Sequence, residues 1–292
     1  MRDIHYLLGY NKLWLTESQH QNDPFEFEGY YKKEFIQEYS DEEYKRYSSS
    51  EEGKQDPISK ESWEKGLPLN KNLIPWQEIC GGLKYHGMYC FSLNPVSTLM
   101  WSHYASYHEG ICIKFKPANK LLAAINTENS LGQKKTITLV KYKVQENEPQ
   151  GPILICGKTT PCPKPIVVDN QVYEYYKKWH EDEIMEKSTQ VGVLDLIGVD
   201  MMLSKAKAWK YEEEFRFILL GGDCKDEGDG LDIKKLMFPN TNTPLLEIDS
   251  VIFGYRTSPV VKEIIQNSFS HLNFSEVEKD IGSYNLKISP VS

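Results

Sequence analysis

Three consecutive glutamates open the segment YEEEFRFILL, which otherwise has the composition of a buried β-strand. At the two-residue period of a strand, Glu212, Glu214 and Arg216 fall on one face and the phenylalanines on the other. On an exposed face, the glutamate and the arginine form an ion pair worth about 0–1 kcal/mol. On a covered face, unpaired charges cost several kcal/mol each and must therefore meet partners or a ligand. We hypothesise that the face lines a ligand site in which Glu214 and Glu212 are catalytic carboxylates. Arg216 then orients Glu214 or holds an anion, and Lys205 is the nearest further partner.

A second group of polar and aromatic side chains lies in LMWSHYASYHEG, which has the length and composition of one short helix. In one interpretation, Trp101, His103 and Tyr104 pack in the core with their polar tips hydrogen-bonded. In the other, Trp101 or Tyr104 stacks on a base or a nicotinamide ring, and His103 donates a hydrogen bond or carries a proton. Ser92, at the end of the preceding strand, adds a hydroxyl group to this second interpretation. The sequence leaves both open.

Common short motifs for metals and nucleotides do not occur in the sequence. His103 and His108 are five residues apart, a poor spacing for one helix face, and H-E-x-x-H is absent, so no metal site is predicted. The acidic stretch DCKDEGDGLD lacks the order of a calcium loop and is expected to be a hairpin turn. Neither G-x-G-x-x-G nor the P-loop pattern occurs, which argues against a Rossmann cofactor or a P-loop nucleotide.

The composition limits the class of protein. The 292 residues are 40% hydrophobic and 12% aromatic, which is enough for a packed core. A formal charge of -8 argues against a general binder of nucleic-acid backbones but allows a small-molecule anion site. No apolar run of about 18 residues is present, so no membrane span is expected, and the first residues do not resemble a secretory signal. The six cysteines are scattered without a C-x-x-C pair, which predicts reduced thiols and a cytoplasmic protein.

The predicted strands and helices do not alternate regularly along the chain, which favours one α+β domain over residues 1–292. Its central sheet is expected to be mixed or mainly antiparallel, with helices flanking it. Residues 40–72 and 145–170 are charged or rich in Pro and Gly and are expected to be loop-rich insertions. The expected strands are Tyr10–Thr16, Gly87–Leu93, Ile111–Pro117, Thr136–Val144, Tyr211–Leu220, Leu245–Tyr255 and Tyr284–Ser289, and the expected helices are 97–110, 172–179, 191–205 and Ser258–Phe269.

Four segments follow one another in an order that resembles a bacterial family of unknown function. They are LWLTESQHQNDPFE, CFSLNPVSTLMWSHYASYHEGICIKF, VKY and KAKAWKYEEEFRFI. On these motifs the chain is similar to domain-of-unknown-function family twenty-nine seventy-one from Leu13 to Asn267, and EIDSVIFGYRTSP fits a later strand and turn of that family. Members open with a strand similar to Y-K-Y-R; here RDIHY takes its place, or the strand is missing. The resemblance points to Asn22 and Asp23, which form a structural corner, and to Ser92, Trp101, His103, Tyr104, Lys205, Trp209, Glu212, Glu214 and Arg216.

The order of an early basic strand, a serine and aromatic segment and a late glutamate strand is similar to ADP-ribosyltransferase-like folds. Some members of the family also look like phage-defence or toxin-type proteins. The resemblance therefore implies an enzyme with NAD as its substrate and no metal. Glu214 holds the ribose and stabilises the positive charge that develops as nicotinamide leaves, as carboxylates do in glycosidases.

Two alternatives stay open. In a metal-independent ribonuclease, His103 and a glutamate do acid–base work while Lys205 and Arg216 hold the phosphate. In a non-catalytic module, the same region senses a ligand or binds a partner. The motifs favour a small nucleotide ligand and no membrane, and they identify no protein or nucleic-acid target.

Overall fold

The computed structural model describes residues 5–17, 27–65, 67–79, 87–117, 137–141, 153–184, 192–220, 231–236 and 244–291. Helices and strands are both abundant and the sheets are antiparallel or mixed, so the predicted α+β class is confirmed. Among these residues, no helix is long and apolar enough to cross a membrane.

The chain divides into two compact units, each built from separated segments of sequence. The first contains Met1–His20, Tyr85–Pro161 and Lys207–Ser292, and the second contains Gln21–Lys84 and Cys162–Ala206. The sequence pattern does not predict this division, because contacts between distant segments define it.

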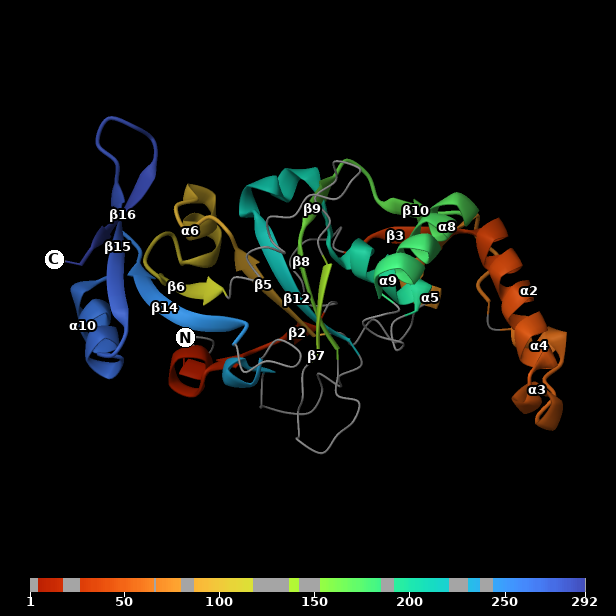
Figure 1. Cartoon of the computed structure of the whole chain (residues 1–292). Helices are drawn as coiled ribbons and strands as arrows, with labels where there is room; N and C mark the ends of the chain where they lie inside the picture. Colours follow the sequence, from red (N-terminus) through yellow and green to blue (C-terminus); the bar gives the residue numbers. More distant parts are fainter. Residues whose placement is uncertain are drawn as a thin grey trace. The chain divides into compact units, whose positions relative to one another are not determined.

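A five-stranded antiparallel sheet with β12 at its centre belongs to the first unit (Figure 1). β12 lies between β5 and β8 and runs antiparallel to both. In this register Ser92 is opposite Glu214, and Cys90 is opposite Arg216. The strands, in order across the sheet, are β2 (Thr16–Glu17), β5 (Gly87–Ser92), β12 (Glu214–Leu220), β8 (Ile153–Lys158) and β7 (Ile137–Lys141).

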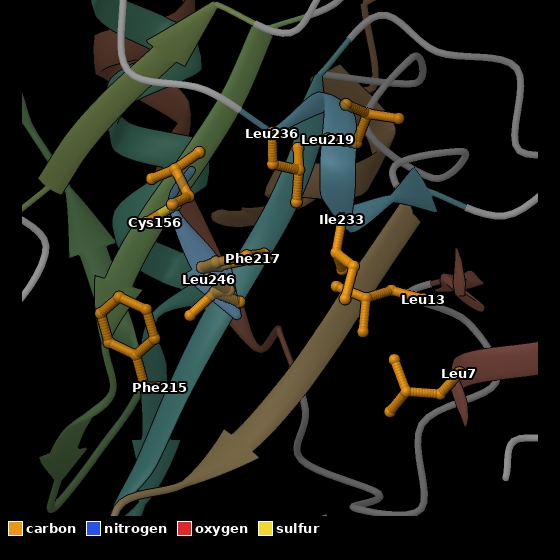
Figure 2. Packing of buried hydrophobic residues seen from close by; sticks show 10 residues of the cluster. Leu7, Leu13, Cys156, Phe215, Phe217, Leu219, Ile233, Leu236 and Leu246 are labelled. Atoms are coloured by element: carbon orange, nitrogen blue, oxygen red, sulfur yellow. The ribbon is translucent and has the colours of Figure 1, made fainter. Parts of the chain in front are cut away.

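One face of β12 enters a hydrophobic core (Figure 2). Phe215, Phe217 and Leu219 lie in this cluster, as the alternation predicts for the two phenylalanines. Each such side chain contributes about 1.5–3 kcal/mol by burial. The other members of the cluster come from short elements around the sheet: η1 (His5–Gly9), β1 (Lys12–Leu13), β8, η6 (Ile233–Lys235) and the residues around it, and the start of β14. These members are Leu7, Leu13, Cys156, Ile233, Leu236, Leu245 and Leu246. β1 also pairs with β13 (Leu231–Asp232).

The first unit also contains a four-stranded mixed sheet with a helix on each face. On one face, Ile265 of α10 (Pro259–Ser268) packs with Val251 and Phe253. On the other, Trp101 of α6 (Thr98–Tyr104) packs with Ile252. The strands, in order, are β16 (Leu286–Pro290), β15 (Asn273–Lys279), β14 (Leu246–Phe253) and β6 (Ile111–Pro117). β15 is missing from the prediction because NFSEVEK is mostly polar; it is held by its parallel pairing with β14 and its antiparallel pairing with β16.

The helix predicted over 97–110 is wrong beyond its first half. Ser97 caps α6 as predicted, accepting a hydrogen bond from the backbone of Met100, but the helix ends at Tyr104. A turn follows in which three successive residues have left-handed backbone: Ser106, Tyr107 and His108, with φ of 47°, 55° and 71°. Such conformations cost about 1–2 kcal/mol per non-glycine residue.

Hydrogen bonds to the end of β14 hold this turn. Gly254 N–H donates to the carbonyl oxygen of Gly110 at 3.0 Å, and Arg256 N–H donates to that of His108 at 3.1 Å. A Cβ at Gly254 would lie 2.1 Å from the His108 carbonyl oxygen, so only glycine fits there. A side chain adds one more hydrogen bond, in which Thr257 Oγ1 donates to the carbonyl oxygen of Gly110 at 2.8 Å.

The second unit has a small sheet surrounded by helices. β3 (Gly29–Lys32) lies between β10 (Ile166–Val168), which is parallel to it, and β4 (Leu73–Pro75), which is antiparallel. The hydroxyl of Tyr176 donates to the carboxylate of Asp200 inside this unit, and burial together with that carboxylate raises the pKa of Tyr176. The helices are α2 (Lys33–Ser49), α3 (Glu51–Gln55), α4 (Lys60–Glu64), α5 (Trp76–Ile79), α8 (Asn170–Trp179), η4 (His180–Ile184) and α9 (Val193–Met202).

The two stretches predicted as loop-rich contain more regular structure than their composition suggests. Residues 40–72 include the second half of the 17-residue α2, followed by the short α3 and α4. Residues 145–170 include β8, β9 (Thr160–Cys162) and β10. Pro163 and Pro165 lie between β9 and β10, whereas the apolar run ILIC belongs to β8, which has a strand on each side in the five-stranded sheet.

We expect His108 to make the stability of the fold fall at acidic pH. Burial lowers the pKa of His108, and the positive charges of Arg256 and Lys279 lower it further. The unfolded chain therefore binds more protons than the folded one below about pH 6.5, so the free energy of unfolding decreases as the pH falls. Urea denaturation between about pH 7 and pH 5 measures this dependence. Asparagine tolerates the left-handed backbone, so His108→Asn should make the free energy of unfolding depend less on pH. The same pH dependence in both proteins would contradict the role of His108.

Candidate functional site

The three glutamates lie where the backbone changes direction ahead of β12. η5 (Lys207–Glu212) is a short 3-10 helix, and Glu213 follows it with a φ of 44°, in the left-handed region. β12 begins at Glu214, so the prediction that Glu212 and Glu214 share a strand face is wrong. The cause is local, because one left-handed residue interrupts the two-residue alternation of a strand.

Contacts from the end of β5 hold Glu213 in its conformation. Leu93 N–H donates to the Glu213 carbonyl oxygen at 2.9 Å, and Asn94 Nδ2 donates to Glu213 Oε1 at 2.9 Å. Ser92 Oγ donates to the carbonyl oxygen of Glu212 at 2.9 Å. Each bond is worth about 0.5–1.5 kcal/mol, which together offsets the backbone strain. Asn94 is thus a positioning residue that the sequence analysis does not identify; its only signal is the Asn-Pro pair after a strand.

Glu214 and Arg216 form a buried ion pair on the face of β12 away from the phenylalanine core. Arg216 Nη2 and Nε donate to Glu214 Oε2 at 2.7 and 3.1 Å. The side chains are 0% and 8% exposed for Arg216 and Glu214. Of the two interpretations of this strand face, the exposed ion pair is therefore wrong, because the face is covered and the pair is buried.

Glu212 receives its partner from α6. Tyr104 Oη donates to Glu212 Oε1 at 2.5 Å, across 108 residues of sequence. Glu212 is only 2% exposed, whereas Tyr104 is half exposed. The aromatic helix and the glutamate segment, predicted separately from the sequence, therefore lie against each other.

The other aromatic candidates divide between core and surface. Trp101 is buried beside Ile252, and its indole Nε1 donates to the carbonyl oxygen of Pro95 at 2.8 Å, which is the core-packing interpretation. His103 is exposed, with its ring 6.1 Å from that of Tyr211. Of the two predicted stacking residues, Tyr104 is therefore the one in contact with the glutamates.

Four further predicted residues remain: Lys205, Asn22, Asp23 and Trp209. Lys205 is buried in β11 (Ser204–Ala206) of the second unit; α9 ends at Met202, so Lys205 does not extend that helix. Asn22 and Asp23 lie outside the described residues. Trp209 lies in η5, with its ring 6.0 Å from that of Tyr211.

One further residue shares the face of the ion pair. Cys90 is directly opposite Arg216 in the register, so the two side chains leave the sheet on the same side. Cys90 is exposed. The sequence provides no signal for it, because the two-residue pattern alone does not show which strands are neighbours.

The arrangement joins two carboxylates to a phenol, a hydroxyl and a guanidinium group. Groups of this kind can transfer protons or stabilise a developing positive charge. In the described part of the chain, no group of three or more His, Cys, Asp or Glu residues is placed to hold a metal ion.

The fold and the site define an α+β protein with a buried carboxylate–guanidinium pair at the start of its central strand. Residues 100–217 match the model of a family described as a protein of unknown function (DUF2971). The matched segment runs from α6 to β12 and therefore includes Tyr104, Glu212 and Glu214. This match supports the family resemblance for that segment. No curated protein and no solved structure matches the chain.

We expect Arg216→Met to reduce the free energy of unfolding by about 3–5 kcal/mol, because it leaves the Glu214 carboxylate without its guanidinium partner in a buried place. Urea denaturation measures the loss. The matched control is Lys287→Met, which removes an ion pair to Glu278 whose side chains are 51% and 44% exposed and should cost about 0–1 kcal/mol. Similar losses in both variants would refute the importance of burial.

The left-handed backbone of Glu213 makes a second stability prediction. Glu213→Gly and Glu213→Ala both remove the hydrogen bond from Asn94, but only glycine adopts this φ without strain. We expect the glycine variant to be more stable than the alanine variant by about 1 kcal/mol. The measurement is the difference between their urea midpoints at equal m-values. An alanine variant at least as stable as the glycine variant would exclude strain at this position.

Proposed function

We propose that the chain is an NAD-consuming, ADP-ribosyltransferase-like enzyme of a phage-defence or toxin type, with its glutamates at the reacting ribose. The observation that supports this proposal is the contact between the two predicted halves of the site. Ser92 is opposite Glu214 in the sheet, and Tyr104 is hydrogen-bonded to Glu212. A serine and aromatic segment thus meets a glutamate strand, as the layout requires. The free thiols among the described residues favour a reducing compartment, in keeping with a cytoplasmic enzyme.

In the proposed reaction, the bond between ribose C1′ and the nicotinamide nitrogen breaks, and its electron pair leaves with nicotinamide. Glu214 stabilises the positive charge left on the sugar, and Arg216 fixes the orientation of that carboxylate. Water or an acceptor hydroxyl then bonds to C1′ and transfers its proton to Glu212, directly or through His103. The Tyr104 ring, held through its hydroxyl, forms the wall on which the nicotinamide stacks.

A non-catalytic module that senses a ligand or binds a partner is the second candidate, and the burial of the ion pair favours a non-catalytic role for these two residues. A guanidinium that is 0% exposed and satisfied by a neighbouring carboxylate is also what a purely structural pair requires. The two candidates differ in one respect, because only the enzyme converts NAD.

We expect the wild-type protein to release nicotinamide from NAD and Glu214→Gln to reduce the rate by about 100-fold or more, as for the loss of one transition-state charge contact. Chromatography of the reaction measures nicotinamide directly. The control is Glu213→Gln, a change of the adjacent exposed glutamate. No nicotinamide and no NAD-dependent thermal shift from wild-type protein would contradict the proposal. A thermal shift without nicotinamide would support the module, and RNA cleavage in EDTA would support a ribonuclease.

A second readout covers the case in which Glu214→Gln does not fold. Cys90 is exposed and opposite Arg216, so NAD bound at this face should slow alkylation of the wild-type Cys90 thiol. Mass spectrometry follows the modification, with Cys90→Ser as the control for the other thiols. An unchanged rate at saturating NAD would exclude binding beside this strand.

A further inference from the structure

A group of basic and aromatic side chains lies at the turn that follows α6, and we call it the basic corner: His108, Tyr255, Arg256 and Lys279. The His108 and Tyr255 rings are 4.9 Å apart, and Lys279 Nζ lies 5.1 Å from the centroid of the Tyr255 ring. Arg256 N–H donates to the His108 carbonyl oxygen. The corner therefore joins the turn after α6 to the ends of β14 and β15.

Within the part of the chain that the structure describes, no carboxylate is paired with the cations of this corner. None of the ion pairs in the described part of the chain involves Arg256 or Lys279. The neighbouring lysines behave differently, because Lys262 is paired with Glu276 and Lys287 with Glu278. Two cations that both act on His108, in a chain with a formal charge of -8, are an arrangement that attracts anions.

His108 supplies an independent sign that a ligand belongs here. Its side chain is buried, and Nε2 is 3.1 Å from Ser102 Oγ, but Nδ1 has no hydrogen-bond partner in the described structure. A buried polar atom without a partner costs about 1–3 kcal/mol. The turn holds it there at the further cost of three left-handed residues. Burial lowers the pKa of His108, and the positive charges of Arg256 and Lys279 lower it further, so both cations act on its ring.

We propose that the basic corner binds the phosphate group of a small ligand. Arg256 and Lys279 neutralise the phosphate charge, and the Tyr255 hydroxyl donates to one of its oxygens. When the anion binds, Nδ1 of His108 takes up a proton and donates it in a hydrogen bond to a phosphate oxygen, which gives this atom its missing partner. A phosphate suits the corner better than a carboxylate, because it carries up to two negative charges for two cations and a histidine. The site shares no residue with the glutamate site, so it does not depend on the proposed enzyme activity.

The test is a titration of the whole chain with inorganic phosphate, pyrophosphate and AMP, each against sodium chloride of the same ionic strength. Calorimetry measures the affinity, and NMR of the imidazole nitrogens measures the protonation of His108. We expect saturable binding of at least one phosphate probe and a rise in the pKa of His108 when it binds. Arg256→Gln and Lys279→Gln should each weaken binding about tenfold or more, as for the loss of a charged hydrogen bond.

Lys287→Gln is the matched control, because it removes a lysine of the adjacent strand that is already paired with Glu278. Its affinity should equal that of the wild type. No saturable binding at millimolar phosphate, pyrophosphate or AMP would overturn the proposal. So would equal binding by wild type, Arg256→Gln and Lys279→Gln, or acetate binding as tightly as phosphate. All three variants change exposed or partly exposed side chains, so thermal unfolding can verify that each one folds.

Discussion

The buried ion pair between Glu214 and Arg216 is the constraint on which the rest of the first unit depends. Both residues lie in the central strand of a sheet, and a charge buried there without its partner would be strongly destabilising. The pairing of β12 with its two neighbours leaves room for the Arg216 side chain to reach its partner. Arg216 is opposite Gly157 on one side, which has no side chain, and opposite Cys90 on the other. The guanidinium can therefore turn along the strand toward Glu214 while the opposite face of the strand stays apolar.

A single left-handed residue gives the two flanking glutamates different surroundings. Because Glu213 breaks the strand, Glu212 ends a 3-10 turn and meets a phenol, while Glu214 begins β12 and meets a guanidinium. Two carboxylates close in sequence but held by different groups are suited to different chemical roles. The strain that achieves this separation is offset by hydrogen bonds from the end of β5, especially that of Asn94.

α6 connects the glutamate site to the basic corner. It is only seven residues long, yet Tyr104 at its end contacts Glu212, and the turn that follows brings His108 to Tyr255. Trp101, earlier in the same helix, packs α6 onto the four-stranded sheet. The turn also contacts the helix directly, because His108 Nε2 lies 3.1 Å from Ser102 Oγ of α6. The two regions share a support but no side chain.

The sequence by itself determined the elements whose signals are local. Alternation located β6, and apolar and aromatic residues located β5 and β14. Ser97 and Ser258 with Pro259 located the starts of α6 and α10, because a cap depends only on near neighbours. Only the tertiary structure decided that β15 is a strand, that α6 stops at Tyr104 and that the chain forms two units. The same holds for the site: the residue types were visible in the sequence, but the burial of Arg216 and the bond from Tyr104 to Glu212 were not. Those depend on strand neighbours and on contacts across more than a hundred residues, which no local pattern records.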